Sequence, residues 1–409
     1  MAEGVRTTAD RDRHELVAGL RRRGAELVLA MVGVTTPEAS GHIDRLREWL
    51  ADGYHGDMAY LAREDAMARR ADLRRTMETV RSVVVVADDY YQNDPPGVPD
   101  DPARGVIARY ARGRDYHKVL KKKLMALGRW LDEQVGGAVF RAYVDTGPIL
   151  ERELAQRAGL GWFGKNTMLI HPRRGSHFFL GVLLVDVDLP ADKPFQADHC
   201  GSCRACLDAC PTGALLGRDE NGAPVMDATR CISYLAIEHR GPIPEELRSL
   251  MANRVFGCDI CQEVCPFVQR FSVVATERDY AAREAWEAVW DRDPADGDVS
   301  AETSDDGTSL EDAAAPTEAV IPTTDGPALV DLMRMSEDEW DAYTRGSAVR
   351  RAGYSGLRRN VAIALGNWLA GRDTPDPEAV GELVAALSDE HPVVAEAAAW
   401  ALGRVEGRR

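Results

Sequence analysis

Residues His199–Leu215 read HCGSCRACLDACPTGAL, a run in which four cysteines lie close together and a proline follows the last of them. The spacing C-x2-C-x2-C-x3-C-P is given by Cys200, Cys203, Cys206, Cys210 and Pro211. Three closely spaced thiolates can hold three corners of a 4Fe-4S cluster, while the fourth cysteine of such a run ligates a second cluster. The run therefore predicts a ferredoxin-like module with two clusters.

The other four cysteines complete this prediction, because all eight fall in the 66-residue window that ends at Cys265. Cys231 stands alone, and FGCDICQEVCPF supplies three more, again followed by a proline. Pairing the two halves by the ferredoxin crossover uses every cysteine. One cluster is then held by Cys200, Cys203, Cys206 and Cys265, and the other by Cys210, Cys231, Cys258 and Cys261.

Zinc is the alternative metal, because C-x2-C pairs also form tetrahedral zinc sites. The tight four-cysteine run closed by proline favours iron-sulfur. A purely structural role for the clusters is also open. Two neighbouring clusters, however, are more typical of a protein that conducts electrons.

Length and composition set the class of protein. The chain has 409 residues, 45% of them hydrophobic and 28% charged, which indicates a globular protein of two or three domains. No apolar run reaches the length of a membrane span, and the polar start MAEGVRTTADRDRHEL lacks the apolar core of a secretory signal. We therefore expect a cytoplasmic protein without disulfides.

The pattern of apolar residues predicts an α+β fold. The N-terminal part is expected to be α/β, with helices over 11–29, 43–61 and 149–160 and strands over 80–91, 139–146 and 178–189, arranged as a mixed sheet. RRNVAIALGN near Ala364 and AEAAAWALGR near Ala401 resemble each other at a spacing of about 37 residues, which indicates HEAT-like helical repeats. Pro392 marks the start of the last helix. Two repeats bury little alone, so they should pack on the preceding domain.

These features predict four parts. They are an α/β catalytic domain over 1–190, a ferredoxin-like module with two 4Fe-4S clusters over 191–285, an acidic disordered insert over 286–326 and helical repeats over 327–409.

Several blocks of this sequence resemble epoxyqueuosine reductase in content, order and spacing. They are GYHGDMAYL, ARGRDYHKVLKKKL, VDTGPILERELAQRAGLGWFGKNT, the cysteine module and RRNVAIALGN. The resemblance covers nearly the whole chain except the acidic insert. It implies a cobalamin-binding N-terminal domain, two 4Fe-4S clusters, and reduction of epoxyqueuosine to queuosine at the wobble position of tRNA, the last step of queuosine synthesis.

Removal of an epoxide oxygen requires electrons and an acid. The clusters would conduct the electrons, which come from an unidentified external donor, and cobalamin would be the reductant. The resemblance implies that Asp145, in VDTGP, donates the proton. Donation at neutral pH requires burial to raise the pKa of this carboxyl. The alternative is an Asx-turn residue bonded to its own backbone.

The resemblance also implies contacts with cobalamin. The sequence has no Asp-x-His-x-x-Gly signature, so a histidine ligand from that motif is not expected. The family has an arginine at Arg70, but this chain has Leu73 where many members have proline. Lys165 and Asn166 look like loop residues at the rim of the site. The implied contacts are Arg70, Asp145, Leu169, Leu180, Ser233 and Asp259.

Local basic groups point to nucleic acid despite the net charge of −16. Lys118, Lys121 and Lys122 fall on one face of a helix that is expected to start near Tyr116, where they can contact phosphates or form an ordinary solvated face. The basic residues between 104 and 129 are Arg104, Arg109, Arg112, Arg114, Lys118, Lys121, Lys122, Lys123 and Arg129, and a second group is Arg350, Arg351, Arg358 and Arg359.

The candidate contacts with tRNA are Lys118, Lys121, Lys122, Arg240 and Arg358. A modified anticodon base is reached only when it is splayed from its neighbours, so the repeats would hold the stem while the pocket receives the base. We expect a monomer. Two other functions stay open: a corrinoid iron-sulfur reductase of a small molecule, similar to a reductive dehalogenase, and a non-catalytic electron carrier or scaffold.

Overall fold

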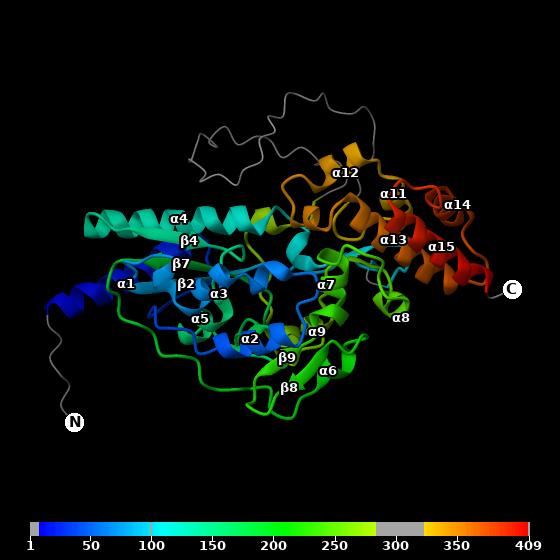
Figure 1. Cartoon of the computed structure of the whole chain (residues 1–409). Helices are drawn as coiled ribbons and strands as arrows, with labels where there is room; N and C mark the ends of the chain where they lie inside the picture. Colours follow the sequence, from blue (N-terminus) through cyan, green and yellow to red (C-terminus); the bar gives the residue numbers. More distant parts are fainter. Residues whose placement is uncertain (1–7, 99, 284–322, 408–409) are drawn as a thin grey trace.

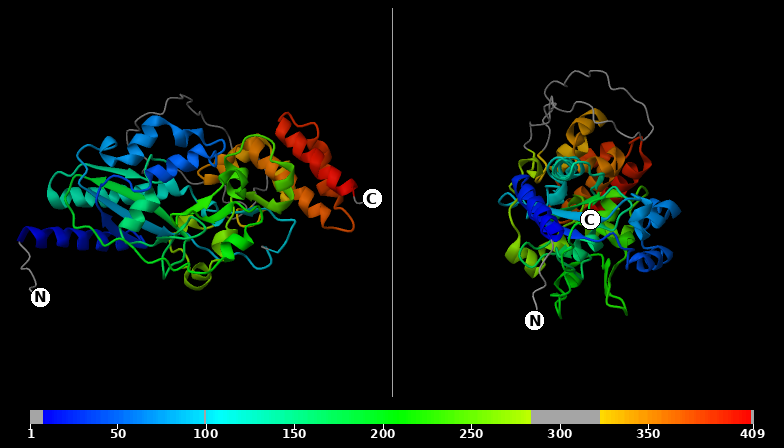
Figure 2. Two further views of the ribbon diagram at one scale, coloured as in Figure 1. Left: turned by 60° about the horizontal axis from the view of Figure 1, so that its bottom comes forward. Right: turned by 90° about the vertical axis from the view of Figure 1, so that its left-hand side faces the viewer.

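The computed structural model describes residues 8–98, 100–283 and 323–407 (Figure 1). The predicted acidic insert lies outside the described residues except for 323–326, and the first seven residues also lie outside them. The sheet domain and the C-terminal helices lie at opposite ends of the molecule, with the cysteine-rich module between them (Figures 1 and 2).

A four-stranded sheet forms the centre of the N-terminal domain, in the order β1-β2-β7-β4. Each neighbouring pair is antiparallel, so the predicted mixed sheet is wrong. The three predicted strands form in shorter versions. The edge strand β1 was not predicted, because its five residues MVGVT give too short an alternating pattern. The strands are β1 (Met31–Thr35), β2 (Ser82–Asp89), β4 (Phe140–Tyr143) and β7 (Phe178–Val185).

Helices cover both faces of this sheet, and the central strand β2 is therefore buried on both sides. Val84 and Val86 of β2 belong to a core shared with α1 (Thr8–Glu26) and α4 (Tyr116–Val135). The alternate residues Val83 and Val85 belong to the other core, which contains residues of α5 (Glu151–Arg157). A continuous apolar run is therefore what a fully covered strand requires.

The predicted helix over 43–61 ends early. Helix α2 (Ile43–Ala51) stops because Gly53 and Gly56 adopt positive φ angles of 75° and 54°. A side chain at Gly56 would meet the phenol of Tyr234 in the cysteine-rich module. The GYHGD block therefore forms a close contact between the N-terminal domain and the cysteine-rich module. The remaining elements of this domain are η1 (Ala59–Ala62), α3 (Glu64–Ala71), η2 (Leu73–Arg75), β3 (Val106–Ile107), η3 (Arg109–Ala111), β5 (Trp162–Phe163) and β6 (Leu169–Ile170).

The cysteine-rich module consists of short elements, as expected for a fold organised around metal clusters rather than a large core. A parallel pair between β10 and β3 joins it to the first domain. Its elements are α6 (Ala205–Ala209), β8 (Leu215–Arg218), β9 (Pro224–Met226), η4 (Ala228–Arg230), α7 (Ile232–Ile237), α8 (Glu245–Arg248), η5 (Ser249–Met251), β10 (Arg254–Phe256), α9 (Ile260–Glu263), α10 (Pro266–Phe271) and η6 (Arg278–Tyr280).

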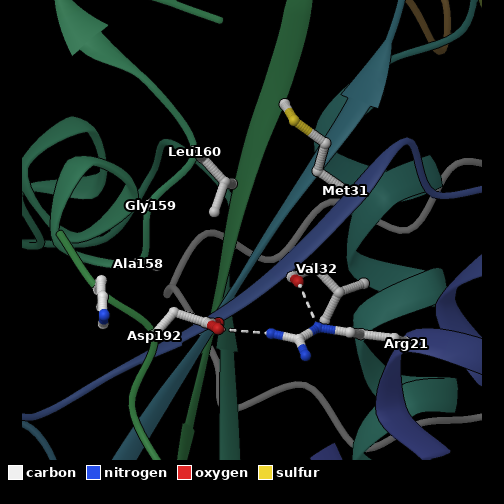
Figure 3. Close-up of a pocket in the computed structure, with 8 residues that line it drawn as sticks. Arg21, Met31, Val32, Ala158, Gly159, Leu160 and Asp192 are labelled. Atoms are coloured by element: carbon white, nitrogen blue, oxygen red, sulfur yellow. Dashed lines mark hydrogen bonds and ion pairs between the residues drawn. The ribbon is translucent and has the colours of Figure 1, made fainter. Parts of the chain in front are cut away.

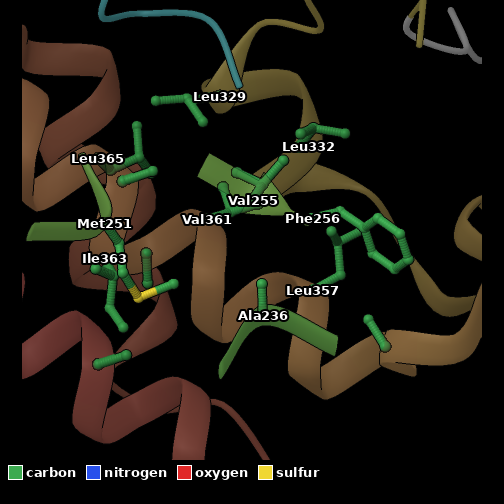
Figure 4. Close-up of a cluster of buried hydrophobic side chains, with 14 of the residues drawn as sticks. Ala236, Met251, Val255, Phe256, Leu329, Leu332, Leu357, Val361, Ile363 and Leu365 are labelled. Carbon is green, nitrogen blue, oxygen red and sulfur yellow. The ribbon is translucent and has the colours of Figure 1, made fainter. Parts of the chain in front are cut away.

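The C-terminal helices pack on the cysteine-rich module through a common core, as predicted. Val255 and Phe256 of β10 contact a cluster that includes Leu357 and Val361 of α13 (Figure 4). The last helix begins at Pro392, also as predicted. The elements are α11 (Leu329–Arg334), α12 (Glu337–Thr344), η7 (Ala348–Ala352), α13 (Tyr354–Ala370), α14 (Pro377–Ala386) and α15 (Pro392–Glu406).

A cavity of about 290 Å³ lies beside the edge strand β1 (Figure 3). The Arg21 guanidinium pairs with Asp192 across its wall at 2.6 Å, and Asp192 also accepts a hydrogen bond from the amide of Val34. The carboxylate thus covers part of an exposed sheet edge. The cavity contains none of the residues predicted for catalysis or cofactor binding. Within the described ranges, no helix combines the length and apolar character that crossing a bilayer requires.

Candidate iron-sulfur and catalytic site

All eight cysteines are free thiols, and their electrostatic neighbours form two sets. Burial, followed by the nearby Cys200, Cys265 and Cys203, raises the pKa of Cys206. On the other side, burial and the nearby Cys210 raise the pKa of Cys231. The neighbours of Cys206 belong to one predicted set and the neighbour of Cys231 to the other, while Cys206 also acts on Cys261 across the two sets. Among the described residues, no three Cys, His, Asp or Glu side chains converge as ligands of one metal ion would.

The two sets differ in depth. Cys203 of the first set is exposed, whereas burial raises the pKa of Cys258 in the second set to about 12 and that of Cys261 well above its ordinary value. Such thiols keep their protons unless a metal replaces them. We call the first set the outer cysteine set and the second the inner cysteine set. The donor type, number and grouping fit two 4Fe-4S clusters.

Asp145 lies two residues after the end of β4 and adopts a positive φ of 56°. Its carboxylate accepts a hydrogen bond from the Tyr116 hydroxyl at 2.7 Å and lies 3.5 Å from Nε2 of His117. The backbone amide of Asp145 donates to Glu151 at 2.6 Å. The Asp145 side chain is nevertheless 64% exposed. It is held in place by neighbours and is open to an incoming group.

The expected rise in the pKa of Asp145 is not what the structure shows. The hydrogen bond from His117 lowers the pKa of Asp145 against the effect of burial, and Tyr116 lowers it further. Burial opposes the charged form of His117, but hydrogen bonds to Asp115 and Asp145 raise its pKa to about 9. Burial raises the pKa of Glu151 to about 8. The groups that hold protons at this site are therefore His117 and Glu151, not Asp145.

The residues expected to contact cobalamin come from several elements. Arg70 is buried and donates to the Leu61 carbonyl at 2.9 Å. Leu169 is buried, whereas Leu180 is the one residue of β7 that is left partly uncovered. Ser233 is half-buried in α7, and Asp259 is buried and accepts a hydrogen bond from the Arg109 amide at 2.8 Å.

Two tyrosines link these residues to Asp145. Burial raises the pKa of Tyr110, and the charges of Asp145 and Asp259 raise it further. Burial raises the pKa of Tyr60, and Asp145 is among the charges that act on it. The ring of Tyr110 meets that of Tyr116, the partner of Asp145, edge-on at 6.0 Å between centroids, and the amide of the adjacent Arg109 donates to Asp259 at 2.8 Å.

The sequence pattern did not identify the partners of Asp145. They lie in ARGRDYHKVL, at the start of the helix that carries the lysines of the predicted basic surface. Asp115 caps α4 by accepting from the His117 amide, and it also bonds the His117 ring at 2.6 Å. The sequence feature that could have indicated these partners is a tyrosine and a histidine at the start of a helix, between an aspartate and a basic run.

The predicted basic surface is smaller in the structure. Lys118, Lys121 and Lys122 are exposed on α4, beginning one residue after His117. Arg240 is exposed but donates to the carbonyls of Ala352 and Arg351.

Other members of the basic groups are structural. Lys123 is buried and pairs with Asp88 at 2.7 Å and Glu277 at 2.9 Å. Arg358 pairs with Asp389. Burial of a cation requires partners, and these partners come from distant parts of the chain. The other basic residues with carboxylate or backbone partners are Arg104, Arg109, Arg112, Arg114, Arg350, Arg351 and Arg359.

Three family models match this chain. The model described as epoxyqueuosine reductase QueG, DUF1730, matches residues 70–146. The 4Fe-4S double cluster binding domain matches 199–268, and the HEAT-like repeat matches 355–405. The predicted double-cluster module and the predicted helical repeats are thereby confirmed as domain types.

Curated relatives and solved structures agree with these matches. The epoxyqueuosine reductase of Escherichia coli K12 is 36% identical over 400 residues, which cover 97% of this chain and 92% of the relative. That of Pseudomonas aeruginosa is 39% identical over 359 residues, with 87% and 86% covered. A crystal structure of epoxyqueuosine reductase with an epoxyqueuosine-modified tRNA-Tyr stem loop superposes with a TM-score of 0.76 at 26% identity, covering 96% of this chain and 90% of that one. This chain is an oxidoreductase that belongs to the epoxyqueuosine reductase family.

Proposed function

We propose that this protein reduces epoxyqueuosine to queuosine at the wobble position of tRNA, the last step of queuosine synthesis, with cobalamin and electrons from two 4Fe-4S clusters. One observation carries the proposal. The carboxylate of Asp145 is held by Tyr116 and His117, the Tyr116 ring meets Tyr110 at 6.0 Å, and the amide of the adjacent Arg109 donates to Asp259, which lies between two inner cysteines in the sequence. A proton source and an electron route thus meet at one point. The relative with a bound tRNA stem loop supports the substrate.

The direct test is conversion in vitro. Purified protein with its cofactors, a reductant and epoxyqueuosine-containing tRNA should yield queuosine in nucleoside mass spectrometry. Reduction of a halogenated small molecule without conversion of the tRNA would favour the corrinoid reductase alternative. Absence of both reactions in fully loaded protein would favour an electron carrier.

The cysteines would hold the clusters as two sets of four. The outer set is Cys200, Cys203, Cys206 and Cys265, and the inner set is Cys210, Cys231, Cys258 and Cys261. The exposed Cys203 supports entry of electrons from an external donor at the outer cluster. The inner cluster would pass them toward Asp259 and the Asp145 site.

We expect about eight iron atoms and eight acid-labile sulfides per chain in anaerobically purified protein, since two cubane clusters use every cysteine. Cys231→Ser should lower the iron content to about four, because it removes a ligand of the inner cluster only. Iron and sulfide assays with electron paramagnetic resonance provide the measurement. Stoichiometric zinc without sulfide would contradict the prediction.

Cobalamin would bind beside Asp145, where it supplies a low-valent cobalt reductant. Arg70, Leu169, Leu180, Ser233 and Asp259 would contact it. The partly uncovered Leu180 in an otherwise buried central strand fits the apolar face of such a ring.

The residues of this chain would manage the protons. The epoxide oxygen leaves as water, and a carbon–carbon double bond remains. This reduction consumes two electrons and two protons. His117 would pass its proton to the Asp145 carboxylate across 3.5 Å, and Asp145 would deliver it to the oxygen. Tyr116 and Glu151 would hold the carboxylate and its backbone in position.

This arrangement predicts a dependence on pH. The raised pKa of His117 keeps the imidazolium charged below about pH 9, and its proton is lost as the pH rises past that value. With pre-reduced enzyme, the rate of epoxide reduction should fall about tenfold per pH unit above this point. His117→Gln should be slower at neutral pH and should lack this limb. Single-turnover rates between pH 6 and 10, roughly, are the measurement. An unchanged alkaline limb in the variant would contradict the role of His117.

The exposed lysines of α4 would bind tRNA phosphates next to the catalytic site, together with the exposed Arg240. Arg358, the other predicted contact, is paired with Asp389 and would contribute less. Replacing Lys118, Lys121 and Lys122 with glutamine should weaken tRNA binding and reduce the salt slope by about 0.7 to 0.9 for each lost contact. Lys123 must be kept, because its buried ion pairs are structural.

Binding titrations at several salt concentrations provide the measurement. Arg22→Gln on α1 is the control, since Arg22 is an exposed cation outside both predicted basic groups and lies 3.6 Å from the exposed Glu15. Unchanged affinity and slope in the triple variant would show that these lysines only solvate the helix.

We further propose that the chain consists of a catalytic domain over 1–190, a double-cluster module over 191–285, an acidic insert over 286–326 and helical repeats over 327–409. We also propose a cytoplasmic location. The match of the double-cluster model to 199–268 and of the repeat model to 355–405 supports the second and fourth parts.

A further inference from the structure

One short segment of the first domain contacts the loops of both cysteine sets. The segment is Trp162–Asn166, which includes β5 and the turn after it. Sequence reasoning placed Lys165 and Asn166 at the rim of the site without a role. In the structure, both point their polar groups at cysteine-bearing loops of the neighbouring module.

Trp162 contacts a cysteine sulfur directly. Its indole Nε1 donates to Sγ of Cys200 at 3.5 Å, and its ring is only 2% exposed. Phe195 stacks on the ring at 5.8 Å between centroids, and Phe267 meets it edge-on at 4.9 Å. These side chains enclose the indole and cover part of the half-buried Cys200, and a hydrogen bond is electrostatically stronger in such surroundings.

Lys165 adds a positive charge to the same loop. Its ammonium donates to the carbonyls of Gly201 and Cys203 at 2.7 and 2.9 Å. The nearby carboxylate of Asp198 is balanced by Arg218 at 2.7 Å. Asp198 also accepts a hydrogen bond from the Cys200 amide at 2.8 Å, and the cation paired with it is Arg218, not Lys165.

The inner cysteine set has different surroundings. The buried Asn166 donates to the carbonyl of Cys261 at 3.0 Å, so it orients a loop without bringing a charge. The nearest acidic group is Asp259, which lies between two inner cysteines in the sequence and is 3.5 Å from the Arg109 guanidinium. The inner set also has a hydroxyl neighbour, Thr212 Oγ1 at 3.7 Å from Cys210 Sγ, and a cation, Arg254, that lowers the pKa of Cys258. The shorter indole contact and the lysine charge are found at the outer set.

We propose that Trp162 and Lys165 raise the reduction potential of the outer cluster, and that this makes the outer cluster the acceptor of the external electron. The inference rests on the proposed presence of two clusters. A reduced cluster carries one more negative charge than an oxidised one, so a donor to its thiolate and a nearby cation stabilise the reduced form. Trp162 and Lys165 are tuning residues, because they act through the cluster and not on the substrate.

The test is a redox titration of the complete anaerobic protein, followed by electron paramagnetic resonance. Trp162→Phe keeps the aromatic packing and removes the donor, and Lys165→Met removes the charge with little change in length. Each should lower the midpoint potential of one cluster and leave the other unchanged. We expect a shift of about three- to tenfold in the ratio of reduced to oxidised cluster at fixed potential, where tenfold equals about 59 mV.

Two further variants separate tuning from folding. Lys165→Arg keeps the charge and should restore most of the potential. Lys193→Met, an exposed lysine beside the β1 cavity, should leave both potentials unchanged. Unchanged potentials in both Trp162→Phe and Lys165→Met at full iron content would overturn the inference. If Trp162→Phe loses iron, the inference is tested by Lys165→Met and Lys165→Arg alone, of which only the first should lower the midpoint potential. Absence of clusters in the unaltered protein would instead overturn the proposed function.

Discussion

Asp145→Asn is expected to retain both clusters and to reduce epoxyqueuosine about 10²- to 10⁴-fold more slowly than the unaltered protein. The amide has nearly the same shape as the carboxyl group but cannot deliver a proton. The backbone should tolerate the change, since asparagine adopts positive φ readily and Asp145 has a φ of 56°. The Tyr116 hydroxyl can still donate to the amide oxygen.

The measurement is single-turnover conversion of epoxyqueuosine in tRNA, read by nucleoside mass spectrometry. Asp44→Asn is the matched control, because Asp44 is an exposed carboxylate on α2 whose partner is the exposed Arg47. It should react at the normal rate. Full turnover by Asp145→Asn at normal iron content would remove Asp145 from the role of acid.

Arg359→Met is expected to lower the free energy of unfolding by about 3 to 5 kcal/mol. Arg359 is 1% exposed and donates to the carbonyls of Leu235, His239 and Gly241 at 2.7 to 2.8 Å. These carbonyls lie in and just after α7, the helix whose N-cap is Cys231. Methionine would leave all three buried acceptors without their donor.

Urea unfolding followed by tryptophan fluorescence provides the measurement. Arg372→Gln is the control, since Arg372 is exposed just after α13 and its contacts are local, with the Thr374 carbonyl and the ring of Trp368. It should change stability by no more than about 0.5 kcal/mol. A loss below about 1 kcal/mol in Arg359→Met would show that water or other groups replace the guanidinium.

Arg359 illustrates where reasoning from the sequence failed. RRNVAIALGN was correctly identified as part of a helical repeat, but its arginines were grouped with a basic surface. Arg359 and Asn360 instead cap the C-terminal end of α7, which begins more than a hundred positions earlier in the chain. A charged residue on a helix has the same local sequence whether it faces solvent or a neighbouring helix end.

Lys123 shows the same limit within one run. It follows Lys121 and Lys122 directly, yet its helix position turns it inward to Asp88 of β2, 35 residues away in the sequence. Tyr280, 192 residues from Asp88, completes this buried group. The helical period places Lys123 on another face than Lys121, but only the packing of α4 on the sheet determines what that face meets.

The sequence by itself determined the features that depend on spacing within one segment. They are the double-cluster module from the cysteine intervals, the buried strand β2 from its apolar run, and the last helix from Pro392 and the apolar pattern after it. The resemblance to a known family added the role expected for Asp145.

The tertiary structure alone decided the antiparallel order of the sheet, the strand β1, the partners of Asp145 and the contacts of Trp162–Asn166 with both cysteine loops. These depend on which distant segments meet, because the pKa of a carboxyl and the surroundings of a thiolate are set by groups within a few ångströms in space. The pKa of Asp145 is lowered because His117 and Tyr116, 28 and 29 residues earlier, lie against it. A periodic pattern reports one face of one element, and only packing determines what that face meets.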